Sequence, residues 1–120
     1  MKISTIQQLL DAKILVGGDH LDTEVHAACG SDMMSDVLAY VKDQAVLMTG
    51  LVNTQVIRTA VMMDMLCVVF VRSKQPTDEM IALAKDSGIV LLQTEKRMYD
   101  ACGILYSNGL VGNRVKEADV

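Results

Sequence analysis

Residues 65–71 read Met-Leu-Cys-Val-Val-Phe-Val, a run of apolar side chains with no polar residue between them. A strand with one face in water alternates apolar and polar side chains, whereas a strand covered on both faces does not. Strands of the second kind lie in the middle of parallel sheets that helices cover on both sides. The run therefore predicts a central strand of a parallel sheet.

Further elements are expected on both sides of this strand. After it, the acidic pair Asp78-Glu79 favours a helix N-terminus, and Gly88 suits the left-handed end of that helix. A strand over 89–92 and a helix over 95–106 capped by Thr94 follow. Before it, we expect a helix over 5–10 capped by Ser4, strands over 13–16 and 25–28, a helix over 32–41 opened by Ser31, a strand over 45–49, and a helix over 54–63 capped by Asn53.

The alternation of strands and helices from Ala45 onward indicates the fold class. Such a pattern favours right-handed crossovers between parallel strands. We therefore expect an α/β protein, a three-layer α/β/α sandwich with a mostly parallel sheet. Residues 1–112 are expected to form a single domain, and residues 113–120 a charged, frayed tail.

The composition fits one packed domain with an apolar surplus. Of the 120 residues, 51% are hydrophobic and 22% charged, which excludes an intrinsically disordered protein. A domain of this size has little interior, so the surplus predicts an apolar surface patch that a partner or a second copy covers. The 11 basic and 15 acidic residues give a net charge of -4, which argues against nucleic acid and anionic membranes as partners.

Cysteine usage and the apolar segments indicate the compartment. The three cysteines, Cys29, Cys67 and Cys102, are odd in number and form no C-x-x-C pair, as is typical of a reduced cytosolic protein. The chain opens without the apolar stretch of a signal peptide, and its most apolar segment, 60–71, is too short to cross a bilayer. A cytoplasmic protein with no membrane partner is expected.

The sequence contains no strong catalytic or metal-binding motif. His26 and Cys29 are three residues apart on extended chain, so they point to opposite faces and cannot form a nucleophile–base pair or share a metal. G-x-S-x-G, G-x-x-x-x-G-K-[ST] and G-x-G-x-x-G patterns are all absent. We expect no catalytic residue, no metal and no cofactor, and a redox or metal enzyme using Cys29 is the least favoured interpretation.

Polar residues follow the carboxyl ends of the expected parallel strands, which share one edge of the sheet. This C-terminal edge would gather residues 50–53, 72–74 and 94–97, with helix N-terminal amides and the positive charges of Arg72, Lys74 and Arg97. Such an edge suits a phosphate or another small anion, although helix caps and solvated lysines also occur there in domains that bind nothing. The candidate ligand-binding residues are Gly50, Asn53, Arg72, Ser73, Lys74 and Thr94.

Five segments resemble stand-alone proteins of the DRTGG domain family. They are residues 28–32 (ACGSD), 34–39 (MSDVLA), 47–53 (LMTGLVN), 56–60 (VIRTA) and 69–72 (VFVR) leading to Pro76. Such domains are similar to the N-terminal domain of HPr kinase, to a central segment of some phosphotransacetylases and to the insert between CBS domains of regulated inorganic pyrophosphatases. The resemblance implies a parallel α/β fold and an accessory or regulatory role, commonly at a dimer contact. It also implies an anaerobic bacterial host and a hydrogenase-type enzyme complex as partner.

The sequence departs from the family pattern at two turns. The acidic/arginine pair of the family would fall near Val52 and Asn53, where neither charge is present. The Thr-Gly-Gly turn of the family would fall near residues 72–74, which contain no glycine. Arg72 and Lys74 offer charges of their own in place of these residues.

Two functions agree with these expectations. The favoured one is a non-enzymatic regulatory or scaffolding domain that acts through homodimerisation and association with other proteins, as an accessory to a metabolic or redox enzyme. The alternative is a sensor that binds a nucleotide or a phosphorylated metabolite at the C-terminal edge of the sheet.

Overall fold

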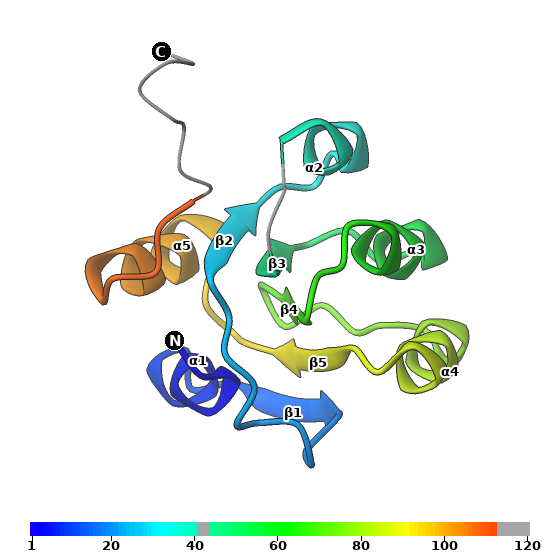
Figure 1. Ribbon diagram of the computed structural model, residues 1–120, viewed down its shortest axis with the longest axis horizontal. Coiled ribbons are helices and arrows are strands. Elements are labelled where there is room, and N and C mark those ends of the chain that lie inside the picture. Colours follow the sequence, from blue (N-terminus) through cyan, green and yellow to red (C-terminus); the bar gives the residue numbers. More distant parts are fainter. Residues whose placement is uncertain (41–43, 113–120) are drawn as a thin grey trace.

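The computed structural model, which describes residues 1–40 and 44–112, contains a five-stranded sheet between two layers of helices (Figure 1). The strand order is β1-β5-β4-β3-β2, in which β2 to β5 run parallel and β1 pairs antiparallel with β5. This arrangement confirms the expected three-layer α/β/α sandwich with a mostly parallel sheet. The elements are α1 (Ile3–Leu9), β1 (Lys13–Val16), β2 (Ala27–Gly30), α2 (Met34–Tyr40), β3 (Ala45–Thr49), α3 (Thr54–Met62), β4 (Cys67–Phe70), α4 (Asp78–Ser87), β5 (Val90–Gln93) and α5 (Met98–Ser107).

Strand β4 is the middle strand of the sheet, as its apolar run predicts. All four of its residues are buried. Val68 and Phe70 pack in the core formed with α2, α3 and α4, whereas Cys67 and Val69 pack in the core formed with α1 and α5. Because both faces of β4 are covered, no position along it favours a polar side chain.

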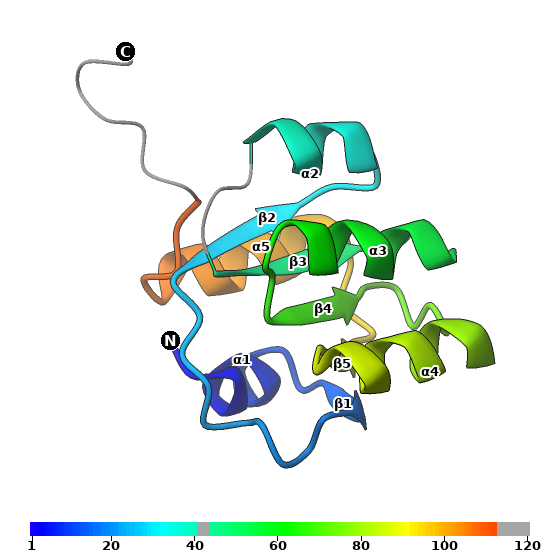
Figure 2. The same ribbon diagram turned by 45° about the vertical axis from the view of Figure 1, so that its right-hand side comes forward.

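The helices are divided between the two faces of the sheet. Helices α2, α3 and α4 cover one face, and α1 and α5 cover the other (Figure 1, Figure 2). The three crossovers from β2 to β5 all pass over the first face, and after β5 the chain returns to the second face, where α5 passes over β3 and β2. None of the helices in the described ranges is long and apolar enough to span a bilayer.

Helix α4 begins and ends as the sequence predicts. The hydroxyl of Thr77 accepts a hydrogen bond from the backbone amide of Met80 at 3.2 Å, which satisfies one of the free amides of the first turn. Gly88 ends the helix with a left-handed φ of 72°.

Helix α1 begins differently from the prediction. It starts at Ile3, with Lys2 rather than Ser4 at the N-cap position. The backbone amides of Ile3 and Ser4 donate to the carbonyl oxygens of Thr23 and Leu21, at 3.0 and 2.9 Å. Since distant backbone carbonyls satisfy these amides, the helix needs no side-chain cap.

Other boundaries also differ from the prediction. Strand β2 occupies Ala27–Gly30 rather than 25–28, and α2 begins at Met34 rather than at residue 32, while the hydroxyl of Ser31 accepts from the amide of Met33 at 3.0 Å. Helix α5 begins at Met98, after Arg97, so Thr94 is not its cap. The predicted end of the second helix at Val41 and the predicted tail over 113–120 lie outside the described residues.

Candidate functional site

The carboxyl ends of β2, β3, β4 and β5 meet at one edge of the sheet, as a parallel arrangement requires. From β4 the chain continues to α4 on one face, and from β5 it continues to α5 on the other (Figure 1). Open α/β sheets bind ligands outside the carboxyl ends of their strands, where neighbouring connections diverge to opposite faces. The C-terminal edge between β4 and β5 is therefore the first place to look for a site.

The turn between β4 and α4 holds two residues in the left-handed region. Arg72 and Ser73 both have a φ of 56°, a conformation that costs a non-glycine residue about 1–2 kcal/mol. Their backbone amides donate to the carbonyl oxygens of Lys96 and Thr94, each at 2.9 Å, and these bonds hold the turn in place. The Thr-Gly-Gly turn implied by the resemblance falls here, and the left-handed backbone explains why glycine suits it.

Gln93 fixes the same turn from β5. Its Nε2 donates to the carbonyl oxygens of Ser73 and Lys74, at 3.2 and 3.0 Å. Because these backbone groups are already hydrogen-bonded within the protein, a ligand at this turn would be bound by the side chains. Those of Arg72, Ser73 and Lys74 are all exposed.

The guanidinium of Arg72 lies against Gly50, the first residue after β3. A Cβ atom added to Gly50 would collide with Nη2 of Arg72 and lie 3.2 Å from its Cζ. The absence of a side chain at Gly50 thus lets Arg72 reach from the end of β4 to the β3–α3 turn. Arg72 thereby brings a positive charge to the turn in which the resemblance implies an acidic/arginine pair and the sequence has none.

Asp32 brings a negative charge to the same turn, and the sequence analysis missed it as a site residue. Its Oδ1 accepts hydrogen bonds from the backbone amide of Gly50 at 2.7 Å and from the hydroxyl of Thr49 at 3.0 Å. The Thr49 hydroxyl in turn accepts from the amide of Leu51 at 3.1 Å. The signals for Asp32 in the sequence are its place just beyond β2 and its place in the segment 28–32 that carries the resemblance.

Asn53 and Thr94, the remaining candidates, lie differently from each other. Asn53 is exposed at the N-cap position of α3, and its side chain makes no capping hydrogen bond. Thr94 is 1% exposed; its hydroxyl donates to the carbonyl of Leu10 at 2.7 Å and accepts from the amide of Lys96 at 3.3 Å. A ligand would have to break these bonds to reach Thr94. Thr94 is therefore placed to hold the loop at this edge in position rather than to bind the ligand. The structure thus brings Gly50, Arg72, Ser73 and Lys74 to one place, with Asn53 at its border.

A hollow of about 310 Å³ opens beside the C-terminal edge, next to the start of β1. Its lining carries both signs of charge, because Lys13 and Lys96 face it together with Asp11 and Glu95. Because its lining carries both signs of charge, this hollow suits an anion less well than the turn that carries Arg72 and Lys74. The other lining residues are Leu10, Ser73, Gln93 and Thr94.

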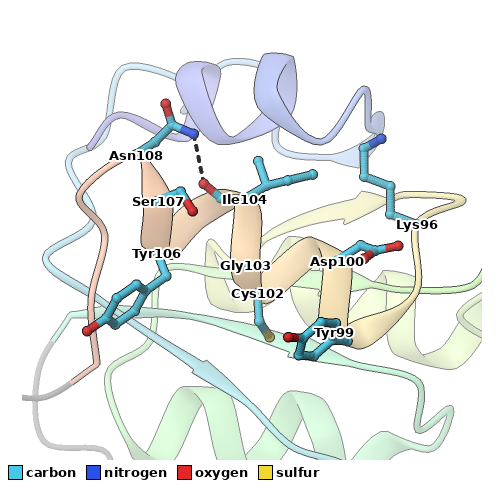
Figure 3. A pocket seen from close by; sticks show the side chains of 9 residues that line it. All are labelled: Lys96, Tyr99, Asp100, Cys102, Gly103, Ile104, Tyr106, Ser107 and Asn108. Atoms are coloured by element: carbon cyan, nitrogen blue, oxygen red, sulfur yellow. Dashed lines mark hydrogen bonds between the residues drawn. The ribbon is translucent and has the colours of Figure 1, made fainter.

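A larger recess of about 800 Å³ runs along the outer side of α5 (Figure 3). Its lining residues all fall between Lys96 and Asn108, so the recess is the surface of one helix and its start. Tyr99 and Tyr106 are 85% and 66% exposed, and Figure 3 shows Tyr99 beside Cys102 on one side of the helix. A surface of this kind suits a broad partner better than an enclosed small molecule.

The cysteines do not form a reactive group. Cys29 packs with the α2, α3 and α4 core and Cys102 with the α1 and α5 core, on opposite sides of the sheet. Burial raises the pKa of both thiols, and it raises the pKa of the fully buried Cys67 well above its usual range. Residues 1–40 and 44–112 contain no group of three or more His, Cys, Asp or Glu side chains placed to hold a metal ion.

Comparisons with known proteins identify a family and a fold. The model of the DRTGG domain family matches residues 5–107. The fold is similar to a crystal structure of the CBS and DRTGG domains of the regulatory region of Clostridium perfringens pyrophosphatase, complexed with its activator diadenosine tetraphosphate. That likeness has a TM-score of 0.69 and 13% sequence identity, and it covers 87% of this chain but 45% of the pyrophosphatase chain. No curated protein matches this chain in sequence.

Proposed function

Because the chain belongs to the DRTGG domain family, we propose that it is a regulatory domain without catalysis of its own that binds a small anion at the C-terminal edge. The ligand class is a nucleotide or a phosphorylated metabolite. The observation that carries this proposal is the guanidinium of Arg72, held over Gly50 by a left-handed turn that the β5–α5 loop fixes. Strained backbone of this kind is concentrated at functional sites.

Charge and position support an anionic ligand. Arg72 and Lys74 are exposed in the same turn of a chain with a net charge of -4, and among the described residues neither forms an ion pair. Guanidinium groups bind phosphate with two parallel hydrogen bonds, and lysines add a point charge. The regulatory region of the pyrophosphatase, whose fold is similar, is complexed with a dinucleoside polyphosphate.

Thermal denaturation with ADP and with pyrophosphate tests the proposal. At a hundredfold excess over the dissociation constant, binding adds about 2.7 kcal/mol, which raises the Tm of a domain of this size by roughly 10 °C. Arg72→Ala should reduce the shift strongly, whereas Arg58→Ala, an exposed arginine on α3, should leave it unchanged. No shift with either compound, or equal shifts in both variants, would remove anion binding at this edge.

A second candidate function is homodimerisation and association with a protein partner. The observation that favours it is the outer side of α5, where Tyr99 and Tyr106 lie exposed beside the edge strand β2 (Figure 3). Tyrosine is enriched at protein interfaces. The other large exposed apolar residues are spread over β1, α2 with the residue that precedes it, and α3.

Sedimentation equilibrium over a concentration series tests the association. A dimer is expected, and Tyr106→Asp should shift it to monomer, whereas Met62→Asp on α3 should not. A monomer at all concentrations would contradict the homodimer. A hydrogenase-type enzyme complex as partner, a cytoplasmic location and an anaerobic host stay predictions from the sequence.

A further inference from the structure

Asp32 and Arg72 reach the same glycine from two different strand ends without pairing with each other. Oδ1 of Asp32 is 2.7 Å from the backbone nitrogen of Gly50, and Nη2 of Arg72 lies against the Cα side of the same residue. Both charged side chains are exposed, and among the described residues they form no ion pair. A ligand that needs a positive and a negative group at a short separation would fit between them.

Within residues 1–40 and 44–112, one carboxylate oxygen of Asp32 makes no hydrogen bond. Both hydrogen bonds that its side chain accepts there, from Gly50 and from Thr49, go to Oδ1. These bonds fix the carboxylate, so that Oδ2 is a pre-oriented acceptor. A carboxylate accepts hydrogen bonds and repels phosphate, so its natural partner on a phosphorylated ligand is a pair of sugar hydroxyls.

An exposed aromatic ring lies on the helix that packs against the end of β2. The start of α5 lies close to Gly30, the last residue of β2, because an added Cβ atom there would lie 3.2 Å from Sδ of Met98. The next residue, Tyr99, is 85% exposed, and its ring projects from the start of the helix (Figure 3). Exposed aromatic rings can stack on the face of any nucleobase, because every base has a π-face.

We infer that the C-terminal edge takes a ribonucleoside phosphate, with its phosphates at Arg72 and Lys74, its ribose hydroxyls at Oδ2 of Asp32 and its base near Tyr99. Both side chains converge on Gly50, so the carboxylate and the guanidinium lie close enough together for one nucleoside diphosphate to reach from its ribose at Asp32 to its phosphates at Arg72. The inference rests on the proposed anion site and names the ligand class that this site selects.

Calorimetric titration of the full chain, in EDTA, with ADP, 2′,3′-dideoxy-ADP and pyrophosphate tests the inference. ADP should bind at least tenfold more tightly than either of the other two, because the dideoxy compound leaves the carboxylate unpaired and pyrophosphate has no sugar or base. In Asp32→Asn, which still accepts hydrogen bonds from Gly50 and Thr49, the preference for ADP over the dideoxy compound should fall towards one.

A pair of variants tests the base position. Tyr99→Ala should weaken ADP binding about fivefold or more without changing pyrophosphate binding. Met62→Ala, at an exposed apolar residue on α3, should change neither.

The outcomes separate this inference from the proposed function. Equal binding of ADP, dideoxy-ADP and pyrophosphate would overturn the ribonucleoside assignment and leave the anion site standing. ADP binding that appears only with added Mg²⁺ would make Asp32 a metal ligand and would also overturn it. If neither ADP nor pyrophosphate binds, the proposed function fails and the inference fails with it.

Discussion

The hydroxyl of Thr94 donates a hydrogen bond to the carbonyl oxygen of Leu10 at 2.7 Å, joining residues 84 positions apart in the chain. Leu10 is the C-cap of α1, and Thr94 directly follows β5. The carbonyl of Thr94 accepts from the amide of Ser73 at 2.9 Å, so the bond from α1 continues into the left-handed turn. The position of Arg72 over Gly50 therefore depends on how α1 packs on the face of the sheet that α5 also covers.

Thr94→Val should destabilise the protein by about 1–3 kcal/mol, because it leaves the buried carbonyl of Leu10 and the amide of Lys96 without a partner. Urea denaturation measures the change. Thr94→Ser keeps the hydroxyl and should recover most of the loss. If the Thr94→Val variant is as stable as the original protein, the hydrogen bond to Leu10 does not stabilise the loop.

Ser73→Gly should stabilise the protein by about 0.5–1 kcal/mol, because glycine adopts the φ of 56° without steric cost. The gain is smaller than the relieved strain, since glycine also increases the freedom of the unfolded chain. The matched control is Ser35→Gly, an exposed serine in α2, which should destabilise. Equal losses of stability in both variants would show that Ser73 is not strained.

Gly50→Ala should fold with nearly unchanged stability but bind pyrophosphate several-fold more weakly, because the new methyl group displaces a flexible guanidinium from its place. Gly17→Ala provides the contrast. Gly17 has a φ of 86°, and its Cβ would lie 3.2 Å from the backbone of Val90, so this variant should lose stability. If Gly50→Ala binds pyrophosphate as tightly as the original protein does, the position of Arg72 over Gly50 does not affect the affinity.

The thiols of Cys29 and Cys102 should react slowly with iodoacetamide at pH 7 and faster as the pH rises through 9. Their pKa values are raised by burial, so the reactive thiolate forms only at alkaline pH. Cys67, which is fully buried, should stay unmodified until the protein unfolds. Mass spectrometry of the modified peptides measures all three rates. A rate for Cys29 that does not change between pH 6 and 9 would mean a thiolate already formed at low pH.

Elements with apolar runs were predictable because their burial follows from local sequence. Strands β1 and β3 occupy the predicted residues, and residues 65–71 contain the middle strand. Thr77 caps α4 as predicted, because its hydroxyl accepts from the amide of Met80, three residues further along the chain. The local sequence therefore predicted the start of α4 correctly.

Caps failed where distant groups competed for the same atoms. Ser4 and Thr94 both have the side-chain oxygen of an N-cap, but the amides near Ser4 bond to the backbone of another segment, and the hydroxyl of Thr94 donates to the carbonyl of Leu10. The gathering of Gly50 and Arg72 was predictable from parallel topology alone. The left-handed φ of Arg72 and the partners of Asp32 were not, because both depend on contacts between segments far apart in sequence.

Nuclear magnetic resonance of the ¹⁵N-labelled protein, titrated with ADP, locates the ligand directly. The largest shifts of amide resonances should fall on Asp32, Gly50 and residues 72–74. Amides at the opposite edge of the sheet, such as those of Gly17 and Gly88, should not move. Shifts confined to that opposite edge, or no shifts at millimolar ADP, would contradict a binding site at the carboxyl ends of the parallel strands.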